Sequence, residues 1–477
     1  MLKETEREGA IDLTSEQLKQ KARQIGAIPE QYQLIIEEYG EDRGTEGGAF
    51  FVWQNAENEE QDISVELDHH GSLISLSKEN VPFEKDALPE ARLLEMALQF
   101  VEHHYPHAAE EFVFQEKKET EQAVQYTYAQ TALDLPLPQT GFFVNIAKSG
   151  EVMKFRYDGG THSYSIPKQI ADKQQVISHY LDQIGFELAI EHIRQELYEG
   201  GDDQPHLIYE TELPFISYPA ASSAECEIKQ TVNDEDEAET LPLPLLSEAE
   251  READIDEMIG FSPSFRKIRE ADLGHSIGIV WREGTDPEPD DLSIAGYFEK
   301  HNQNTLKITK DKKTGKLKGV ASFIQTEGPP VWTEQACLKR ALQFLYQLYP
   351  EAEKLFRMHP SESEENERKA HFQFDLQYEG VPLRLGFANI SIDRINGRIV
   401  GYLGPDIEPE TLKRLNPAPA ISAEEAKAVF ASAFDVSLQW ERDYKREKND
   451  HYKLVYRPVY PGFIDAHDGK VFLMKTI

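Results

Sequence analysis

The sequence predicts an α+β protein of two homologous halves, each built from helices that lie on antiparallel sheets. The first observation is an internal repeat, because EMALQFVEHHYP, which begins at Glu95, returns as KRALQFLYQLYP at Lys339, 244 residues later. The second is that helical and strand periodicities follow in the same order in both copies. The third is length, since 477 residues exceed what one hydrophobic core usually organises.

The repeat extends over most of the chain. LDLPLPQTGFFVNI aligns with YEGVPLRLGFANI, and HLIYETELP aligns with KLVYRPVYP 247 residues later. Near the start, IGAIP aligns with IGFSP, and a following match places Trp53 opposite Trp281. Because the order is kept, we predict a first half over residues 1–218 and a second half over 245–477.

An acidic linker is predicted between the halves, over residues 219–244. It contains the run NDEDEAE, which cannot bury apolar surface. Cys226 falls in this linker, and we expect its thiol to be exposed. Neither Cys226 nor Cys337 belongs to a paired motif, so neither a disulfide framework nor a zinc knuckle is indicated.

Each half is predicted to contain three helix-then-strand units. The first helix of each half has a capping box, formed by Thr14 with Gln17 and by Ser247 with Glu250. The third helix of the second half begins in the same way at Ser422.

The second helix is the clearest element. Its apolar residues recur at helical spacing in both copies: Leu94, Ala97, Leu98, Val101 and Tyr105, then Leu338, Ala341, Leu342, Leu345 and Tyr349. Pro106 and Pro350 mark the end of the helix, because a residue that precedes proline is pushed out of helical angles.

Alternating residues predict the strands that follow. In HFQFDLQY the apolar residues are Phe372, Phe374, Leu376 and Tyr378, and FANISID alternates in the same way. Gly380 with Pro382 predicts one turn and Asn396-Gly397 predicts a tight hairpin. Strands joined by tight turns pair antiparallel.

Composition excludes some classes of partner. The chain has 50 Lys and Arg against 86 Asp and Glu, a net charge of −36, which disfavours nucleic acids and anionic membranes. The charged N-terminus MLKETEREGAIDLTSEQ does not resemble a signal peptide, and no apolar stretch approaches the length of a membrane span. We expect a cytoplasmic protein.

One pattern points to a nucleophile. Gly274-His275-Ser276-Ile277-Gly278 matches the G-x-S-x-G pattern of serine hydrolases, in which the serine lies between a strand and a helix. Here the match follows a charged stretch that we expect to be helical and leads into a strand, so we interpret it as a strand-entry turn. A hydrolase that uses Ser276 remains the alternative.

Histidines and carboxylates give weak metal signals. His103, His104 and His107 cluster at a helix end that Pro106 interrupts, and we interpret them as solvated. His69-His70 indicates a turn. Asp286-Pro-Glu-Pro-Asp-Asp291 could gather Ca²⁺ but lacks the ligand spacing of an EF-hand loop, as does Asp465-Ala-His-Asp-Gly469.

Two further groups of residues, a pair of glutamates and the four tryptophans, are candidates for a function. Glu187 and Glu191 are placed on one face of a predicted helix, a spacing that is frequent by chance at this composition. Trp53, Trp281, Trp332 and Trp440 could line a peptide groove, but the two at matching repeat positions favour core packing. We therefore expect no catalytic, cofactor-binding or metal-binding residues, and no cofactor.

Two segments resemble known modules. LQYEGVPLRLGFANISIDRINGRIVGY resembles the segment shared by the YcdB/YcdC repeated-domain family and the propeptides of thermolysin-like proteases. ISAEEAKAVF with YKLVYRPVYPGFIDAHDGKVF resembles a PepSY module. The YcdB/YcdC resemblance covers the whole chain and implies a bacterial protein of PepSY-like repeats with no established activity, while the related modules imply a link to peptidases.

The first half departs from this resemblance. Its tail reads PFISYPAASSAE, without the Asp465, Ala466 and Gly469 of the second half, so this copy has lost a hairpin or uses it differently. No protease domain is attached, so we expect no propeptide function in cis.

The sequence thus predicts a non-enzymatic module that binds or regulates a protein or peptide, through sheet edges that accept an extended strand. A basic partner or a peptidase would fit the acidic surface. The alternatives are a hydrolase that uses Ser276 or an acidic metal site, and an acidic structural protein or homodimer.

Overall fold

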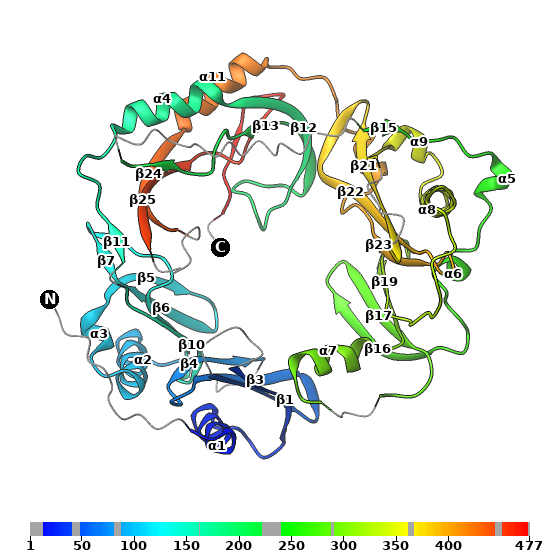
Figure 1. The fold of residues 1–477 in the computed structure, drawn as a ribbon. Helices are drawn as coiled ribbons and strands as arrows, with labels where there is room; N and C mark the ends of the chain where they lie inside the picture. The colour runs from blue at the N-terminus through cyan, green and yellow to red at the C-terminus, as the bar shows by residue number, and fades with distance from the viewer. Residues whose placement is uncertain are drawn as a thin grey trace.

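The computed structural model describes residues 13–40, 48–80, 87–161, 163–221, 240–287, 291–360, 367–443 and 451–475. The fold is α+β with mostly antiparallel sheets, as the sequence predicts. The two large sheets stand on different sides of a ring, and the last units of both halves complete it, with most helices on the outer side (Figure 1). Among the helices in these ranges, none has the length and apolar character that crossing a bilayer requires.

The elements follow the repeat. The first half contains α1 (Ser15–Gly26), β1 (Tyr32–Tyr39), β2 (Gly48–Asn55), β3 (Asn58–Asp68), β4 (Leu73–Glu79), α2 (Glu90–His104), α3 (Ala108–Glu111), β5 (Val113–Glu119), β6 (Ala123–Ala129), β7 (Thr131–Ala132), β8 (Leu135–Pro136), β9 (Gly141–Ala147) and β10 (Val152–Gly159). Its last unit contains β11 (Tyr164–Ser165), α4 (Lys173–Gln183), β12 (Gly185–Ile193), β13 (Gln204–Glu212) and β14 (Tyr218–Pro219).

The second half contains β15 (Leu241–Pro242), α5 (Glu248–Arg251), α6 (Ile255–Met258), β16 (Arg266–Leu273), β17 (Ser276–Arg282), α7 (Ile294–Asn302), β18 (Thr305–Asp311), β19 (Leu317–Ser322), α8 (Glu334–Leu348), α9 (Ala352–Leu355), β20 (Phe356–Met358), β21 (Lys369–Tyr378), β22 (Val381–Asp393) and β23 (Ile399–Leu403). Its last unit contains α10 (Pro409–Leu412), α11 (Ala423–Ala433), β24 (Asp435–Arg442), β25 (Tyr452–Val459), β26 (Phe463–Asp465) and β27 (Val471–Phe472).

The two large sheets have the same strand order. The first runs β1-β2-β3-β4-β10-β9-β6-β5, and the second runs β16-β17-β18-β19-β23-β22-β21-β20, with β15 added beyond β20. Each strand of one sheet therefore has a counterpart in the other at the same position. This shared order is the structural form of the sequence repeat.

The helix starts are as predicted. Thr14 with Gln17, Ser247 with Glu250 and Ser422 with Glu425 all form capping boxes, in which side chain and backbone satisfy each other's free groups.

The helix faces are close to the prediction. α2 and α8 end just before Tyr105 and Tyr349, the residues that precede the prolines. The buried face of α2 consists of Leu93, Ala97 and Val101, so Leu93 was missed and Leu94 is only partly buried.

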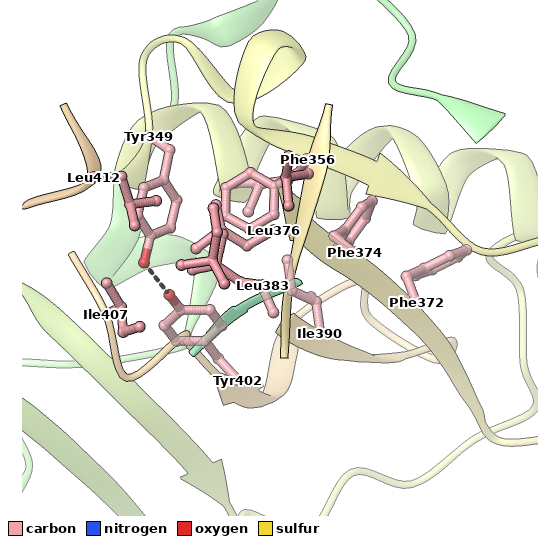
Figure 2. Close-up of a cluster of buried hydrophobic side chains, with 14 of the residues drawn as sticks. Tyr349, Phe356, Phe372, Phe374, Leu376, Leu383, Ile390, Tyr402, Ile407 and Leu412 are labelled. Atoms are coloured by element: carbon pink, nitrogen blue, oxygen red, sulfur yellow. Dashed lines mark hydrogen bonds between the residues drawn. The ribbon is translucent and has the colours of Figure 1, made fainter. Parts of the chain in front are cut away.

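The tyrosine before the proline packs into the core in both copies. Tyr105 stacks on Tyr157 with ring centroids 3.5 Å apart. In the second half Tyr349 points into a cluster of aromatic and aliphatic side chains from β21, β22 and β23, where its hydroxyl lies 3.3 Å from that of Tyr402 (Figure 2). Burial raises the pKa of Tyr349 to about 12. The repeated Tyr-Pro therefore ends a helix and fills the core beneath it.

The turns of the second half refine the prediction. β21 and β22 are joined by Glu379-Gly380 alone, and Pro382 lies inside β22 opposite Gln377. The loop at Asn396-Gly397 has four residues, because β22 pairs through the hydrogen bond from the Asp393 amide to the Arg398 carbonyl at 2.9 Å.

The first helix is the main local difference between the halves. α1 is continuous over 12 residues, whereas its counterpart is divided into α5 and α6. The division occurs because the Asp254 carboxylate accepts the amides of Asp256 and Glu257 and so starts a new helix.

An insertion in the second half closes the ring on one side. Where β2 and β3 are joined by a short turn, β17 and β18 are separated by residues 283–304, which include α7. α7 packs against β1 of the first half (Figure 1). The Glu37 amide donates to the Leu292 carbonyl at 2.7 Å, so the outer edge of β1 is covered.

The last units close the ring on the other side by exchanging hairpins. The β12–β13 hairpin of the first half pairs with β26 of the second, and the β24–β25 hairpin of the second half pairs with β14 of the first. The helices follow the exchange, because α11 packs on β12 and α4 packs on β24. Each sheet of the joint therefore contains strands from both halves.

Matched hydrogen bonds show that the exchange is reciprocal. The Tyr209 hydroxyl donates to the Ile421 carbonyl at 2.8 Å, and the Tyr456 hydroxyl donates to the Ala171 carbonyl at 2.9 Å. Tyr209 and Tyr456 are equivalent in the repeat. Each anchors its hairpin to the start of the other half's helix.

A pair of glycines tests the packing of the second-half hairpins. Gly397 has a φ of 74°, and a Cβ there would lie 2.1 Å from the Trp332 ring, whereas Gly315 has a φ of 69° and open space. We expect Gly397→Ala to lower the free energy of unfolding by about 2 kcal/mol more than Gly315→Ala, because only the first adds a clash to the shared backbone strain. Urea unfolding measures both. Equal losses would contradict the packing of Trp332 against this turn.

Candidate functional site

Ser276 does not occupy a nucleophile elbow. It is the first residue of β17 and pairs with Leu273 at the end of β16 across the two-residue turn Gly274-His275. The order is strand, turn, strand, and a hydrolase elbow requires strand, turn, helix. The interpretation of this motif as a strand-entry turn is confirmed, but the helix expected before it was wrong, because residues 266–273 form β16.

The histidines do not converge. His104, the last residue of α2, was wrongly expected to be solvated, because its ring packs against Phe100 with centroids 4.7 Å apart. Burial and then the neighbouring His103 lower the pKa of its imidazole to about 4. His107 is exposed, and its amide donates to Glu102. His69 and His70 form the turn between β3 and β4, as predicted. Across the described ranges, no three His, Cys, Asp or Glu side chains lie where they could hold a metal ion.

The described carboxylates of the acidic sequence 286–291 bind neighbouring side chains. The Asp286 carboxylate binds the guanidinium groups of Arg266 and Arg282 at 2.8 and 2.7 Å, which lowers its pKa. Asp291 accepts the Ser293 hydroxyl at 2.7 Å at the start of α7. Residues 288–290 lie outside the described residues, as does Cys226.

The tryptophans are core residues. Trp53 and Trp440 are buried, and the Trp440 indole donates to the Ala132 carbonyl at 2.9 Å. Trp281 and Trp332 pack against the core of the second half. The prediction that the tryptophans pack in the core is thus confirmed, and they do not line a peptide groove.

The placement of Glu187 and Glu191 on a helix was wrong. Both lie on β12, since α4 ends at Gln183 and Gly185 begins a strand with period-two alternation. Glu191 is buried and binds Arg384 of β22 at 3.1 Å, while Glu210 of β13 binds the same guanidinium at 2.5 Å. This cluster fixes the second large sheet to the exchanged hairpin.

The tail that resembles a PepSY module forms a polar bridge between the halves. His206 of β13 lies between two carboxylates, 2.7 Å from Asp465 of β26 and 3.1 Å from Asp202. The hydrogen bond to Asp465 raises the pKa of His206 against the effect of burial. Burial alone would raise the pKa of Asp465, but its bonds to His206 and to the His467 amide lower it.

The first-half tail keeps one strand of this arrangement. Tyr218 and Pro219 form β14 and pair with Tyr456 and Val455 of β25. This strand is therefore used as β26 is in the second half, since each pairs with the hairpin of the other half. The residues that correspond to the second strand of the hairpin, 224–225, lie outside the described residues.

The outer edges of the large sheets form the candidate binding site. Two of the four outer strands are covered by the chain itself, since β1 contacts the segment before α7 and β20 pairs with β15. Among the strands that the structure describes, β5 pairs only with β6, and β16 pairs only with β17. An unpaired edge can bind an extended chain through its backbone groups.

The two open edges differ in character. β5 begins with Val113 and Phe114, whose exposed fractions are 51% and 49%. β16 carries Arg266, Lys267 and Arg269, and its one strongly exposed apolar residue is Leu273, at 57%. The sequence predicted binding at sheet edges, but neither β5 nor β16 was predicted as the strand. The alignment of Phe112 with Phe356 was a sequence signal for β5. It places the apolar residues Val113 and Phe114 at the sequence positions of β20, the strand that β15 covers in the second half.

The comparisons agree with a duplicated α+β protein of two large-sheet repeats. The YcdB, YcdC repeated domain matches residues 15–159 and 248–406, which contain the two large sheets. The chain belongs to this family. It is 41% identical over 459 residues to "Uncharacterized protein YcdC" of Bacillus subtilis (strain 168), with 96% of this chain and 99% of that one covered.

Other likenesses are of two kinds. "Uncharacterized protein YcdB" of the same organism is 42% identical over 473 residues, with 97% of this chain and 98% of that one covered. Among solved structures, the Bacillus megaterium YpeB C-terminal domain matches 42% of this chain and 88% of its own, at 14% identity and a TM-score of 0.27. A likeness at that score carries no conclusion.

The His206 bridge should make stability depend on pH. A raised pKa means that the contribution of His206 is complete below its unfolded value of about 6.5 and is lost as pH rises through the folded value. We expect His206→Gln to lower the free energy of unfolding by about 1–3 kcal/mol at pH 6 and by less at pH 9.

Urea unfolding at the two pH values measures this difference. His275→Gln is the control, because His275 is exposed in the turn between β16 and β17. A loss of stability in His206→Gln that is the same at both pH values would contradict a charged bridge.

Proposed function

We propose that the protein is a non-enzymatic, cytoplasmic module that binds an extended segment of another protein or a peptide along a sheet edge. The single observation that carries this proposal is that the chain repeatedly completes its own sheets with short added strands. β15 is added to β20, β14 to β25, and β26 to β13. Sheets that accept three short strands from distant parts of the chain offer the same backbone geometry to a strand from a partner.

Charge supports a basic partner. The net charge of −36 raises the local concentration of cationic proteins and speeds their approach, while it repels nucleic acids and anionic membranes. A basic protein with an extended apolar segment would be attracted by the negative charge and could pair with a sheet edge. A peptidase is one class of partner to consider, since the third unit of the second half resembles a PepSY module.

The elements of the joint are compatible with the PepSY resemblance. α11 lies on a sheet that contains β12 and β26, and α4 lies on one that contains β24. On this proposal each module is assembled from both halves. A helix and tail strand come from one half and the hairpin from the other.

Affinity capture from native lysate tests the proposal. The full-length protein should retain a basic protein at near-stoichiometric amount at about 0.05 M salt and release it towards about 1 M, because screening shortens the reach of surface charge. A control protein of equal size and net charge should not retain it. Retention of nothing above that control, or of a partner that salt does not release, would contradict the proposal or its electrostatic part, respectively.

A serine substitution separates this proposal from a hydrolase. If any hydrolysis is detected with the purified chain, Ser276→Ala should leave its rate unchanged, because Ser276 is a hairpin residue of β17. A fall by orders of magnitude would identify Ser276 as a nucleophile and overturn the non-enzymatic proposal.

A further inference from the structure

We infer that the outer edge of β5, at Val113 and Phe114, binds an extended, apolar, proline-containing segment as an added antiparallel strand. This inference rests on the proposed function and gives it a site and a ligand class. It comes from the duplication, because the second half displays the same edge with a strand already bound.

The two edges hold the same place at the end of the shared strand order, and both begin after a matching phenylalanine. Phe112 and Phe356 are 244 positions apart, follow the short helices α3 and α9, and are both buried. Their amides donate to Ala108 and Ala352, the first residues of those helices. By sequence position Val113 thus corresponds to Arg357 and Phe114 to Met358, although β5 is shifted along its neighbour by two residues relative to β20, since Phe114 lies opposite Tyr128 and Phe356 lies opposite Leu376.

In the second half this edge is occupied. Leu241 pairs with Met358 and Pro242 pairs with Arg357, in antiparallel register. The Arg357 guanidinium also binds Thr240, through its hydroxyl at 2.8 Å and through its carbonyl. Residues 240–242 thus lie along β20 as a bound peptide would, and the segment continues to Pro244 at α8.

The occupied edge also shows which ligand groups matter. Leu243 is buried in the core, and the Tyr346 hydroxyl donates to the Pro244 carbonyl at 3.2 Å. Pro242 and Pro244 have no amide hydrogen, so the added strand ends the sheet instead of extending it. An apolar residue every second position, separated by proline, is therefore the pattern that this kind of edge accepts.

In the first half the residues at these sequence positions are exposed. Val113 and Phe114 each expose about half of their surface, whereas Arg357 and Met358 are only partly exposed beneath β15. The Phe114 ring meets Tyr128 edge to face at 5.5 Å and leaves its other side open. No described strand lies beyond β5. Two adjacent large apolar side chains on an unpaired edge mark a surface that a partner strand would bury.

The charges of β5 favour an uncharged ligand at this point. Lys117 binds Glu90 at 2.8 Å and Glu119 at 3.5 Å, and Lys148 also binds Glu119, at 3.0 Å. The charges of these side chains, which come from β5, α2 and the turn after β9, neutralise one another. β16 is the less suitable edge, since three of its first four residues are basic and exposed. The lysines of β5 also disfavour pairing of two β5 edges from different copies.

A labelled peptide tests the inference. The probe is Thr-Leu-Pro-Leu-Pro-Leu-Leu-Ser, the sequence of residues 240–247, titrated into the full-length protein and followed by fluorescence anisotropy. We expect saturable binding, with slower hydrogen exchange at residues 113–119. The same peptide with Leu241→Asp and Leu243→Asp should not bind, because it lacks the apolar pattern.

Matched variants locate the site. Phe114→Lys should weaken binding about tenfold, because it places a charge in the contact, and Val113→Asp should act in the same direction. Leu273→Lys is the control, since it makes a similar change at a similarly exposed residue of the other open edge. Thermal melting of each variant shows that the fold is kept, as expected for half-exposed residues.

The outcomes separate this inference from the proposed function. Binding that protects residues outside 113–119, or that Leu273→Lys weakens more than Phe114→Lys, overturns the site but leaves a peptide-binding module. Absence of saturable binding overturns the inference, whereas a salt-released partner captured from lysate would still support the proposed function. A dimer in sedimentation that Phe114→Lys dissociates assigns the edge to a second copy and overturns the ligand class.

Discussion

The reciprocal exchange of hairpins is the constraint on which the ring depends. The β12–β13 hairpin completes a sheet with β26, and the β24–β25 hairpin completes one with β14, so neither last unit buries a core alone. Buried residues from both halves meet in these sheets, and the ion pairs of Arg384 with Glu191 and Glu210 attach the β12–β13 hairpin to the second large sheet. The α7 contact with β1 then closes a circuit that two separately folded halves would leave open (Figure 1).

The differences between the copies are as informative as the repeat. Both large sheets keep one strand order, but their edges are treated differently. The second half covers β20 with β15 and carries the α7 insertion that covers β1 of the first half. Duplication therefore supplies two comparable scaffolds, and the segments added around one of them show what the other leaves exposed. The proposed partner site therefore rests on the edge of β5, where the two copies differ, and not on the core that they share.

Local sequence signals predicted local structure well. The three capping boxes, the helix ends before Pro106 and Pro350, and the alternation around Phe372 all appear in the fold. Strand partners could not be predicted in the same way, because period-two alternation reveals which face is buried and not which strand lies alongside. Glu191 was misplaced for a related reason, since an i, i+4 spacing is compatible with one face of a helix and one face of a strand alike. The β5 edge needed the structure, because exposure of Phe114 becomes informative only beside the covered Met358.

The exchange has a consequence for how the chain is made. Tyr209 pairs with Ile464, which lies 255 positions further along the chain. At translation rates of about 5–20 residues per second, the first hairpin waits roughly 13–50 s for its partner strand. During that time its apolar face and its unpaired edge are exposed, until β26 has been synthesised and pairs with β13. The C-terminal strand therefore completes the architecture of the N-terminal half, and a chain that stops short of it leaves both halves unfinished.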